Sequence, residues 1–554
     1  MKARKITVFL LAVLLCVCPA VCAAGADSDV PDGSVPVEEN GSVEEGTLRV
    51  AFSEPFQTMD VQQTTDEYAV PLNIFERLFE VRVNEDGSAT LENSLAEDYS
   101  VSGDGLTYSF TLRDDAFFSD GTKVTASDVA FTFIRMLTLP ESVHSNLADL
   151  ILGSQALMAH ETEELEGVRV LDERNLEITL SEPFTGFVYQ LAAPGCSILS
   201  EKAVTEADSL FGVIADKTIG SGPYMVTEFS DYRVRLERNP YYHSPDGTEP
   251  SVQKVEIRFL APALLDQSFQ AGDLDILDTY HILPDVAEKV YLSGKWKNRL
   301  VSRRRVEVQY LMLNVKTVPL SDIRVRKAIQ MSINRQQLLD TLYGGRGKLL
   351  DGIFPEGLIG FTQENQGWLK YDKEEASRII REIPDASDII IELAADTHGN
   401  YRDLHMLRMI QDDLFEVGLT ASIVSYDGYS RDYLRKNGML MAYNGTWGAD
   451  YDDPDNFINT YFGSTDKTHN RSSNYDDLTV IDRIVKARTI PDETERLSEY
   501  AALEKRLIED DAVWVPLFST DHVFVLGDRV QSFTPFWAGW SSMYYTDVVL
   551  KPKT

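Results

Sequence analysis

Cysteine is scarce in this sequence. Of the four cysteines, Cys16, Cys18 and Cys22 lie within the first 22 residues, and only Cys196 remains in the body of the chain. A single cysteine cannot form an intramolecular disulfide, so the fold has to be stabilised without one. The neighbours of Cys196 in LAAPGCSIL are apolar or small, which predicts a buried thiol that packs as a small hydrophobic residue rather than a nucleophile.

Basic residues are also few relative to acidic ones. The chain has 52 lysines and arginines against 88 aspartates and glutamates, and its formal charge is −36. Such a surface repels phosphates, which argues against nucleic-acid binding and against adhesion to anionic lipid. It is compatible with the steering of cationic ligands, although an acidic surface also simply keeps a protein hydrated and dispersed.

Long apolar runs are absent after the N-terminus, where no segment reaches the roughly 20 apolar residues of a membrane-spanning helix. Residues 1–24 combine the basic head MKARK, a short apolar run and small residues, which predicts a secretory signal peptide. Two alternatives stay open at its end: Cys22 becomes a lipid attachment site, as in bacterial lipoproteins, or the leader is cleaved near Ala24. Val21 stands where lipoproteins prefer a small residue. Residues 25–46 are rich in glycine, serine, proline and acid, which predicts a flexible acidic tether.

The short motifs that identify common enzyme classes are missing. The chain has no GxSxG, HExxH, P-loop or dinucleotide-binding glycine pattern. One stretch, TWGADYDDPDNF (446–457), places four aspartates within six residues. It lacks the glycine and the twelfth-position glutamate of a calcium-binding loop, so we expect no metal there. Paired carboxylates of a hydrolase are compatible with the spacing but have no supporting signature.

Local patterns predict an α/β architecture with more than one sheet and two to four domains. Alternating or continuous apolar runs predict strands, and apolar residues at helical spacing predict helices. The main strands are expected at 47–52, 389–396 and 419–426, and the main helices at 70–81, 125–137, 321–343 and 403–417. The pairs Asp104–Gly105 and Asp120–Gly121 predict tight turns.

Seven segments are informative because they occur together. They are IFERLFE (74–80), LAEDYSVSGDGLTYSFTLRDDAFFSDGTKVTASDVAFTF (95–133), GSGPYMVTEF (220–229), LERNPYY (236–242), FQAGDLDI (269–276), YLMLNVKTVPLSDIRVRKAIQMSINRQQLL (310–339) and TWGADYDDPDNFINTYF (446–462). In order and spacing they resemble the solute-binding proteins of ABC importers, specifically family 5 of the extracellular solute-binding proteins, which serves oligopeptide and dipeptide uptake. The resemblance covers nearly all of residues 47–520.

The resemblance implies a bilobal fold like that of periplasmic binding proteins, with two mixed α/β lobes, hinge strands and an extra inserted domain. Lobe I is expected to be discontinuous and to comprise residues 47–72, 215–302 and 515–554. The inserted domain of lobe I is expected at 73–214, and lobe II at 303–514.

The resemblance also implies a ligand site. In the family, the aspartate of a Trp-x-x-Asp segment pairs with the α-ammonium of the peptide, which assigns that role to Asp450 and makes Trp447 the wall of a pocket. The main chain of Thr446 and Gly448 is expected to pair with the peptide as an added strand. The alternative for Asp450 is a turn-capping residue before Pro454.

The other acidic residues of this stretch are expected to have structural roles. Asp452, Asp453 and Asp455 are interpreted as turn formers and as the start of a helix over NFINTYF, with the energetics of exposed charges. Peptide binders also often hold the ligand carboxylate with a basic residue. No motif selects one among the candidates upstream of Trp447, which are Arg431, Arg435 and Lys436.

The resemblance therefore predicts an extracytoplasmic substrate-binding protein that captures peptides and delivers them to an ABC importer. Its partners would be the peptide and the permease subunits, with no nucleic acid, and membrane contact only through a lipid on Cys22. We expect a monomer, in the periplasm or at the outer face of the cell membrane, with no catalytic residue, cofactor or metal. Two alternatives remain: the same fold binding a nickel chelate, an opine or an oligosaccharide, or a secreted hydrolase.

Overall fold

The structure is a computed structural model that describes residues 44–65, 68–84, 88–244, 250–384, 390–397 and 401–552. The expected leader and nearly all of the expected tether, Cys22 included, lie outside these residues. Within the described ranges, no helix combines the length and the apolar character that crossing a bilayer requires.

The first described strand lies in a four-stranded sheet with the order β1-β10-β9-β8. Its strands are β1 (Thr47–Phe52), β10 (Lys254–Phe259), β9 (Arg233–Arg238) and β8 (Tyr224–Phe229). β1 pairs in parallel with β10, and the other pairs are antiparallel. Alternation in RVRLER buries Val234 and Leu236 and leaves Arg233 and Arg235 at the other face. The first strand thus pairs with a segment about 200 residues later in the chain.

A second four-stranded sheet, of order β4-β5-β7-β6, lies between these segments in the sequence. Its strands are β4 (Ala96–Val101), β5 (Thr107–Leu112), β7 (Asn175–Thr179) and β6 (Val168–Val170). Gly105 has φ +72° in the turn that joins β4 to β5, as the Asp-Gly pair predicts.

The helix expected at 125–137 is present as α2 (Ala126–Thr138), and it shares a core with this second sheet. A capping box starts it: the Thr125 hydroxyl and backbone N–H both donate to Asp128, at 2.7 and 2.9 Å. Cys196 is buried in the same core, as predicted, and burial raises the pKa of its thiol to about 12.

The third and longest sheet has the order β11-β18-β13-β17-β15-β16. Its strands are β11 (Ile276–Asp278), β18 (Trp514–Leu526), β13 (Glu307–Leu313), β17 (Ala442–Gly448), β15 (Ile390–Asp396) and β16 (Thr420–Tyr426). Helix α11 (Tyr401–Glu416) connects the parallel strands β15 and β16, and its buried residues Leu407, Ile410 and Leu414 follow the helical period.

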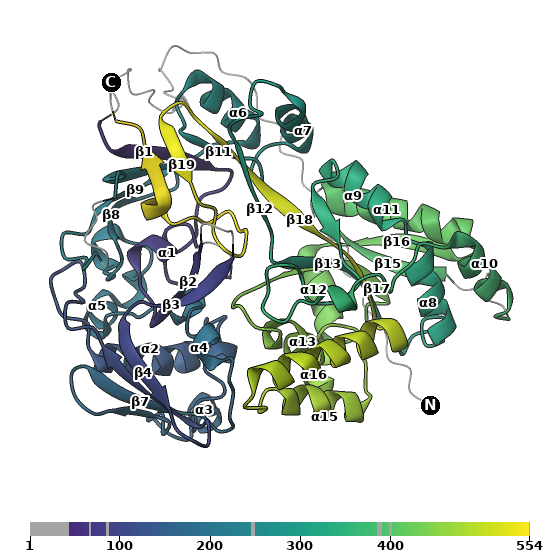
Figure 1. The fold of residues 1–554 in the computed structure, drawn as a ribbon, viewed down its shortest axis with the longest axis horizontal. Coiled ribbons are helices and arrows are strands. Elements are labelled where there is room, and N and C mark those ends of the chain that lie inside the picture. The colour runs from purple at the N-terminus through teal and green to yellow at the C-terminus, as the bar shows by residue number, and fades with distance from the viewer. Residues whose placement is uncertain are drawn as a thin grey trace, which may run out of the picture. The chain divides into compact units, whose positions relative to one another are not determined.

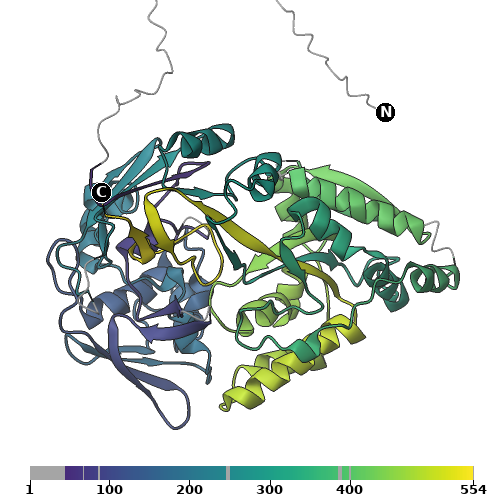
Figure 2. The same ribbon diagram turned by 45° about the horizontal axis from the view of Figure 1, so that its top comes forward.

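Strand β18 is unusually long and changes partners along its length. Its first part pairs with β13, and its last residues pair with β11 and with β12 (Leu300–Arg304). Figure 1 shows β18 running between these two sets of strands, and Figure 2 shows the same strand, in yellow, from a second direction. It therefore belongs to both parts of the sheet.

The remaining elements connect and cover the sheets. The helices are α1 (Pro71–Ile74), α3 (Ser154–Met158), α4 (Phe187–Gln190), α5 (Glu201–Ala207), α6 (Pro262–Ala271), α7 (Pro284–Leu292), α8 (Ile323–Ser332), α9 (Arg335–Tyr343), α10 (Lys373–Arg381), α12 (Gly428–Lys436), α13 (Asp455–Phe462), α14 (Thr465–Asn470), α15 (Leu478–Ala487) and α16 (Glu493–Lys505). The strands are β2 (Phe79–Val83), β3 (Ala89–Asn93), β14 (Gly347–Leu349), β19 (Val530–Phe533) and β20 (Val548–Leu550).

Two of the expected helices differ in the structure. The helix predicted at 70–81 is reduced to α1, and the chain then extends into β2, which pairs with β3. The helix predicted at 321–343 is divided into α8 and α9. The side chain of Asn334 accepts a hydrogen bond from the backbone of Gln337 at 3.1 Å and so caps the start of the second helix.

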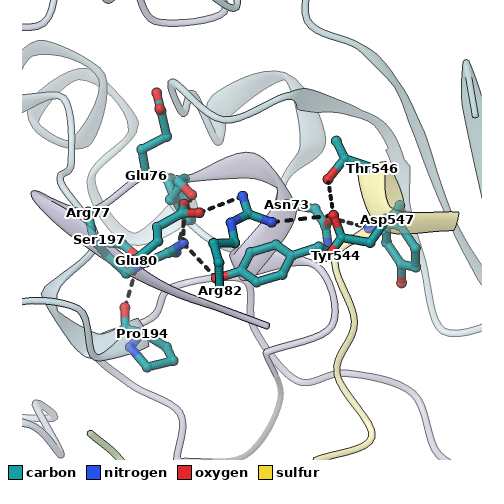
Figure 3. Close-up of polar contacts among 12 residues, drawn as sticks. Asn73, Glu76, Arg77, Glu80, Arg82, Pro194, Ser197, Tyr544, Thr546 and Asp547 are labelled. Atoms are coloured by element: carbon teal, nitrogen blue, oxygen red, sulfur yellow. Dashed lines mark hydrogen bonds and ion pairs between the residues drawn. The ribbon is translucent and has the colours of Figure 1, made fainter. Parts of the chain in front are cut away.

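A buried polar network explains why the segment after α1 is not helical (Figure 3). Arg77, which is fully buried, donates to Glu80 at 2.5 Å and to the hydroxyl of Tyr544 at 3.2 Å. Arg82 pairs with Glu80 at 2.6 Å and with Asp547 at 3.4 Å. These contacts join β2 to a segment more than 460 residues later, and no local pattern could have indicated them.

Candidate functional site

A cavity of about 1090 Å³ lies against the end of β17, and Thr446, Trp447, Gly448 and Asp450 all line it. The rest of its wall comes from distant parts of the chain, including the loop after β1, the loop at 143–149, and the C-terminal segment with Trp540. The structure thus brings the four predicted ligand residues to one cavity. Their contact with a ligand stays a prediction.

Strand β17 presents one open edge beside this cavity. On one side it pairs with β13 along its whole length, with Trp447 opposite Val308. On the other side, β15 pairs with it only at Ala442. Among the described residues, 443–448 therefore have no strand partner on that edge, and Thr446 is exposed there. An open edge of this kind offers backbone N–H and C=O groups to an extended ligand.

Asp450 is partly buried and faces the cavity. Its side chain and backbone form a reciprocal pair with Asn456: the Asn456 amide donates to Asp450 Oδ2, and the Asp450 backbone N–H donates to Asn456 Oδ1, both at 2.9 Å. No basic side chain in the described part of the chain lies within ion-pairing distance of Asp450. Burial raises the pKa of its carboxyl, with the Asn456 hydrogen bond, His144 and Arg471 acting in the opposite direction.

Trp447 forms an aromatic wall of the cavity. Its indole N–H donates to the Asn456 carbonyl at 3.1 Å, which fixes the ring. The ring meets Tyr461 edge to face at 5.5 Å between ring centres. Asn456 thus orients both Trp447 and Asp450 through separate hydrogen bonds.

The prediction that the neighbouring aspartates are exposed is wrong. Asp452, Asp453 and Asp455 are buried, with exposed fractions of 7%, 0% and 1%. Asp453 pairs with Arg496 at 2.7 Å, and both side chains are fully buried. The partner is 43 residues away on α16, so the sequence around Asp453 could not indicate it.

The other two aspartates are also held by distant groups. Asp455 pairs with Arg488 at 3.0 Å, and Asp452 accepts a hydrogen bond from the backbone of Ile359 at 2.7 Å. Burial raises the pKa of Asp452 to about 7. The expectation that this stretch starts a helix is confirmed, because α13 begins at Asp455.

The cavity also contains basic side chains that the sequence did not single out. Its basic residues are Arg305, Arg435, Lys436, Lys467, Arg471 and Arg488. Arg435 and Lys436 were candidates for holding a ligand carboxylate, whereas Arg431 lines a separate cavity of about 190 Å³ and donates to the Asn444 carbonyl at 2.9 Å. No motif surrounds the other four. Among the described residues, no group of three or more histidines, cysteines, aspartates or glutamates is arranged to hold a metal ion.

A family profile and individual relatives agree on the kind of protein that this sequence resembles. Residues 90–469 match the sequence profile described as bacterial extracellular solute-binding proteins, family 5 Middle. The chain is 28% identical over 487 residues to the probable D,D-dipeptide-binding periplasmic protein DdpA of Escherichia coli strain K12, covering 86% of this chain and 89% of that protein. It is 27% identical over 449 residues to di/tripeptide-binding protein 2 of Pseudomonas aeruginosa strain UCBPP-PA14, covering 78% and 81%.

Solved structures identify the fold. The periplasmic binding protein DppA of Helicobacter pylori, in complex with the peptide STSA, superposes with a TM-score of 0.72 at 22% identity, covering 91% of this chain and 98% of that one. The fold is the bilobal α/β fold of periplasmic binding proteins, which confirms the fold class expected from the sequence.

Proposed function

Because the chain belongs to the bacterial extracellular solute-binding proteins of family 5, we propose that it captures peptides outside the cytoplasm and delivers them to the permease subunits of an ABC importer. Relatives named for dipeptides and for di- and tripeptides support a peptide ligand. The observation that carries the proposal is Asp450, a cavity-facing carboxylate whose described contacts are to the neutral amide of Asn456.

The proposed role of Asp450 is to pair with the α-ammonium of the peptide. An ammonium that leaves water needs an opposite charge to offset its lost hydration, and a carboxylate supplies a charge-assisted hydrogen bond. Asn456 already occupies Oδ2, while Oδ1 accepts no hydrogen bond within the part of the chain that the structure describes. The ammonium would therefore approach a carboxylate whose orientation is set in advance.

The proposed role of the β17 edge is to bind the peptide main chain. The N–H and C=O groups of Thr446 and Gly448 lie next to Asp450, so a peptide whose ammonium is held there would extend along β17 as an added strand. Main-chain pairing gives affinity without selecting side chains. Trp447 would cover the first residue of the ligand.

Substitution of Asp450 tests the proposal. Asp450→Asn keeps the shape and removes the charge, so the ammonium would be enclosed without a partner. Breaking such a pair from one side costs about 2–5 kcal/mol, which is roughly 30- to several-thousand-fold in affinity. Calorimetry with a free-amine peptide measures the loss. The same peptide acetylated at its N-terminus should bind poorly to both proteins.

A matched control is Glu54→Gln, because Glu54 also lines the cavity but is exposed to solvent. This change should cost less than about 1 kcal/mol. Equal affinities of native protein and Asp450→Asn for free-amine peptides would leave Asp450 as a turn residue only, and the peptide proposal would lose its main support.

A binding role also predicts that bound peptides stay intact. We propose that the protein is not an enzyme, so peptides that copurify with it should be recovered uncleaved by native mass spectrometry. Cleavage products formed during incubation with a peptide mixture would support the hydrolase alternative instead.

We further propose that Cys22 carries a lipid, because an acidic tether after the leader fits a domain held away from a membrane. Cys22→Ala should then release the protein from the membrane fraction. If native protein and variant are equally released, cleavage near Ala24 is the better account.

A further inference from the structure

Two of the basic side chains in the cavity have no carboxylate partner among the described residues. Arg305 pairs with Glu307 at 3.0 Å, Arg488 pairs with Asp455 at 3.0 Å, and both Arg435 and Lys436 pair with Asp432. By contrast, no acidic side chain in the described ranges lies within 4.0 Å of the charged nitrogens of Lys467 or Arg471. These two cations are therefore available to a ligand.

Arg471 is positioned by aromatic rings rather than by an ion pair. It follows α14, and its backbone carbonyl accepts a hydrogen bond from the hydroxyl of Tyr443 at 2.8 Å. The centre of its guanidinium lies 4.7 Å from the ring centre of Tyr461 and 5.2 Å from that of Trp447. The N–H groups of the guanidinium donate no hydrogen bond within the described part of the chain. A stacked guanidinium with free donors has the planar fork that binds a carboxylate bidentately.

Lys467 lies one helical turn before Arg471, and residues four apart on a helix lie on the same face. Its ammonium donates to the side-chain oxygen of Asn459 at 3.3 Å, a neutral partner. Burial lowers the pKa of Lys467, so a negative charge nearby would stabilise its charged form. Both side chains line the cavity that contains Asp450.

The composition of the cavity wall also favours a ligand with a negatively charged group. The whole chain has 88 acidic and 52 basic residues. The cavity wall instead has six basic residues against five acidic ones, which are Glu54, Asp149, Glu307, Asp450 and Asp455. A wall so different from the rest of the chain favours a ligand that carries negative as well as positive charge.

We propose that Lys467 and Arg471 bind a carboxylate of the ligand while Asp450 binds its ammonium. This inference rests on the proposed function and narrows its substrate class to peptides with a carboxylate that reaches Arg471 beside the Trp447 ring. Two parts of a peptide can supply this carboxylate: the C-terminus of a short peptide, or an acidic side chain near the N-terminus of a longer one.

Affinity ratios measured by calorimetry test the inference. The probes are Ala-Ala-Ala with a free C-terminus, its C-terminal amide, and the amides of Ala-Glu-Ala and Ala-Gln-Ala. We expect the native protein to prefer one carboxylate form over its neutral counterpart by about 10- to 100-fold, the range for hydrogen bonds to charged groups. A preference for the free acid over the amide identifies the C-terminus, and a preference for glutamate over glutamine identifies the side chain.

Arg471→Gln should bring that ratio close to one, and Lys467→Gln should reduce it. Arg471→Lys should restore part of it, since it keeps the charge without the fork. Lys486→Gln is the control, because Lys486 is an exposed cation on α15 that pairs with Asp482 and does not line the cavity, and it should leave the ratio unchanged.

Three outcomes would overturn the inference. The first is a native protein that does not distinguish carboxylate from neutral probes. The second is an Arg471→Gln variant that keeps the native ratio. In both cases the peptide proposal stands, provided that the probes bind and Asp450→Asn weakens them. The third is a native protein that binds none of the free-amine probes, which would overturn the proposed function as well.

Discussion

The four aspartates between Asp450 and Asp455 have the same side chain and different partners. Asp453 and Asp455 are neutralised by arginines on or near later helices, and Asp452 accepts a backbone hydrogen bond. Among the described residues, the Asp450 carboxylate forms no ion pair and accepts a hydrogen bond only from the neutral amide of Asn456. A ligand cation gains most where the protein has not already supplied one, which is why Asp450 rather than its neighbours is the proposed ammonium site.

The raised pKa of Asp450 predicts how the affinity for a peptide depends on pH. Burial raises that pKa, so in the free protein the carboxyl takes up a proton at a higher pH than an ordinary aspartate does. An ammonium binds to the ionised form only. Affinity for a free-amine peptide should therefore be constant from above the raised pKa up to about pH 7, where the α-ammonium of the peptide begins to lose its proton, and should fall as the pH drops through the raised pKa, by at most tenfold per pH unit.

Calorimetry across pH 4 to about 7, below the pKa of the peptide α-amine, checks this expectation. The Asp450→Asn variant should show a flat profile over the same range, because it has no carboxyl to protonate. A decline in affinity that is identical in the variant would assign the pH dependence to another group.

Two buried ion pairs with later parts of the chain hold helix α13, which follows the acidic stretch. Asp453, just before its start, contacts Arg496 on α16, and Asp455, its first residue, contacts Arg488 after α15. Figure 1 shows α13, α15 and α16 close together at one end of the long sheet. Because Trp447 and Asp450 are both bonded to Asn456 of α13, the position of this helix sets the geometry of the ligand site.

Removal of one charge from this anchor should destabilise the protein strongly. Asp453→Asn leaves the Arg496 guanidinium buried without a carboxylate, which costs about 3–5 kcal/mol in the free energy of unfolding. Urea denaturation followed by circular dichroism measures it. The comparison variant is Asp482→Asn, which breaks an exposed pair with Lys486 on α15 and should cost no more than ~0.5 kcal/mol. Equal small losses in both variants would mean that the buried pair contributes no more than a surface one.

At the scale of the whole molecule, the chain passes between the two parts of the long sheet at two neighbouring places. One is the step from β12 to β13 at 304–307, and the other is the middle of β18, where its partners change. We propose these as hinge strands between lobe I (47–72, 215–302 and 515–554, with its inserted domain at 73–214) and lobe II (303–514). The cavity wall combines Phe52 and His144 with Trp447 and Arg471, so it draws on both proposed lobes.

A ligand that contacts both lobes should favour a closed arrangement, because only that arrangement makes all of its contacts. Small-angle scattering should therefore give a smaller radius of gyration for the peptide-loaded protein than for the free protein. An unchanged radius, with binding verified by calorimetry on the same sample, would rule out the hinge.

The sequence by itself determined those features that depend on neighbouring residues. The helix α2, the Asp104–Gly105 turn and the strands β1, β15 and β16 follow from local patterns, and the structure confirms them. The family followed from seven segments read together. Four candidate ligand residues also followed from a motif, and the structure places all of them at one cavity.

Only the tertiary structure decided which charges are available and which are neutralised. The burial of Asp453 depends on Arg496, 43 residues later. The segment around Arg77 is not helical because Arg77 contacts Tyr544, 467 residues later. Arg471 has no motif, and its place beside Trp447 results from the packing of α13 and α14. Periodicity and capping act over a few residues, whereas the partner of a buried charge is chosen by long-range packing, so the first could be predicted from the sequence and the second could not.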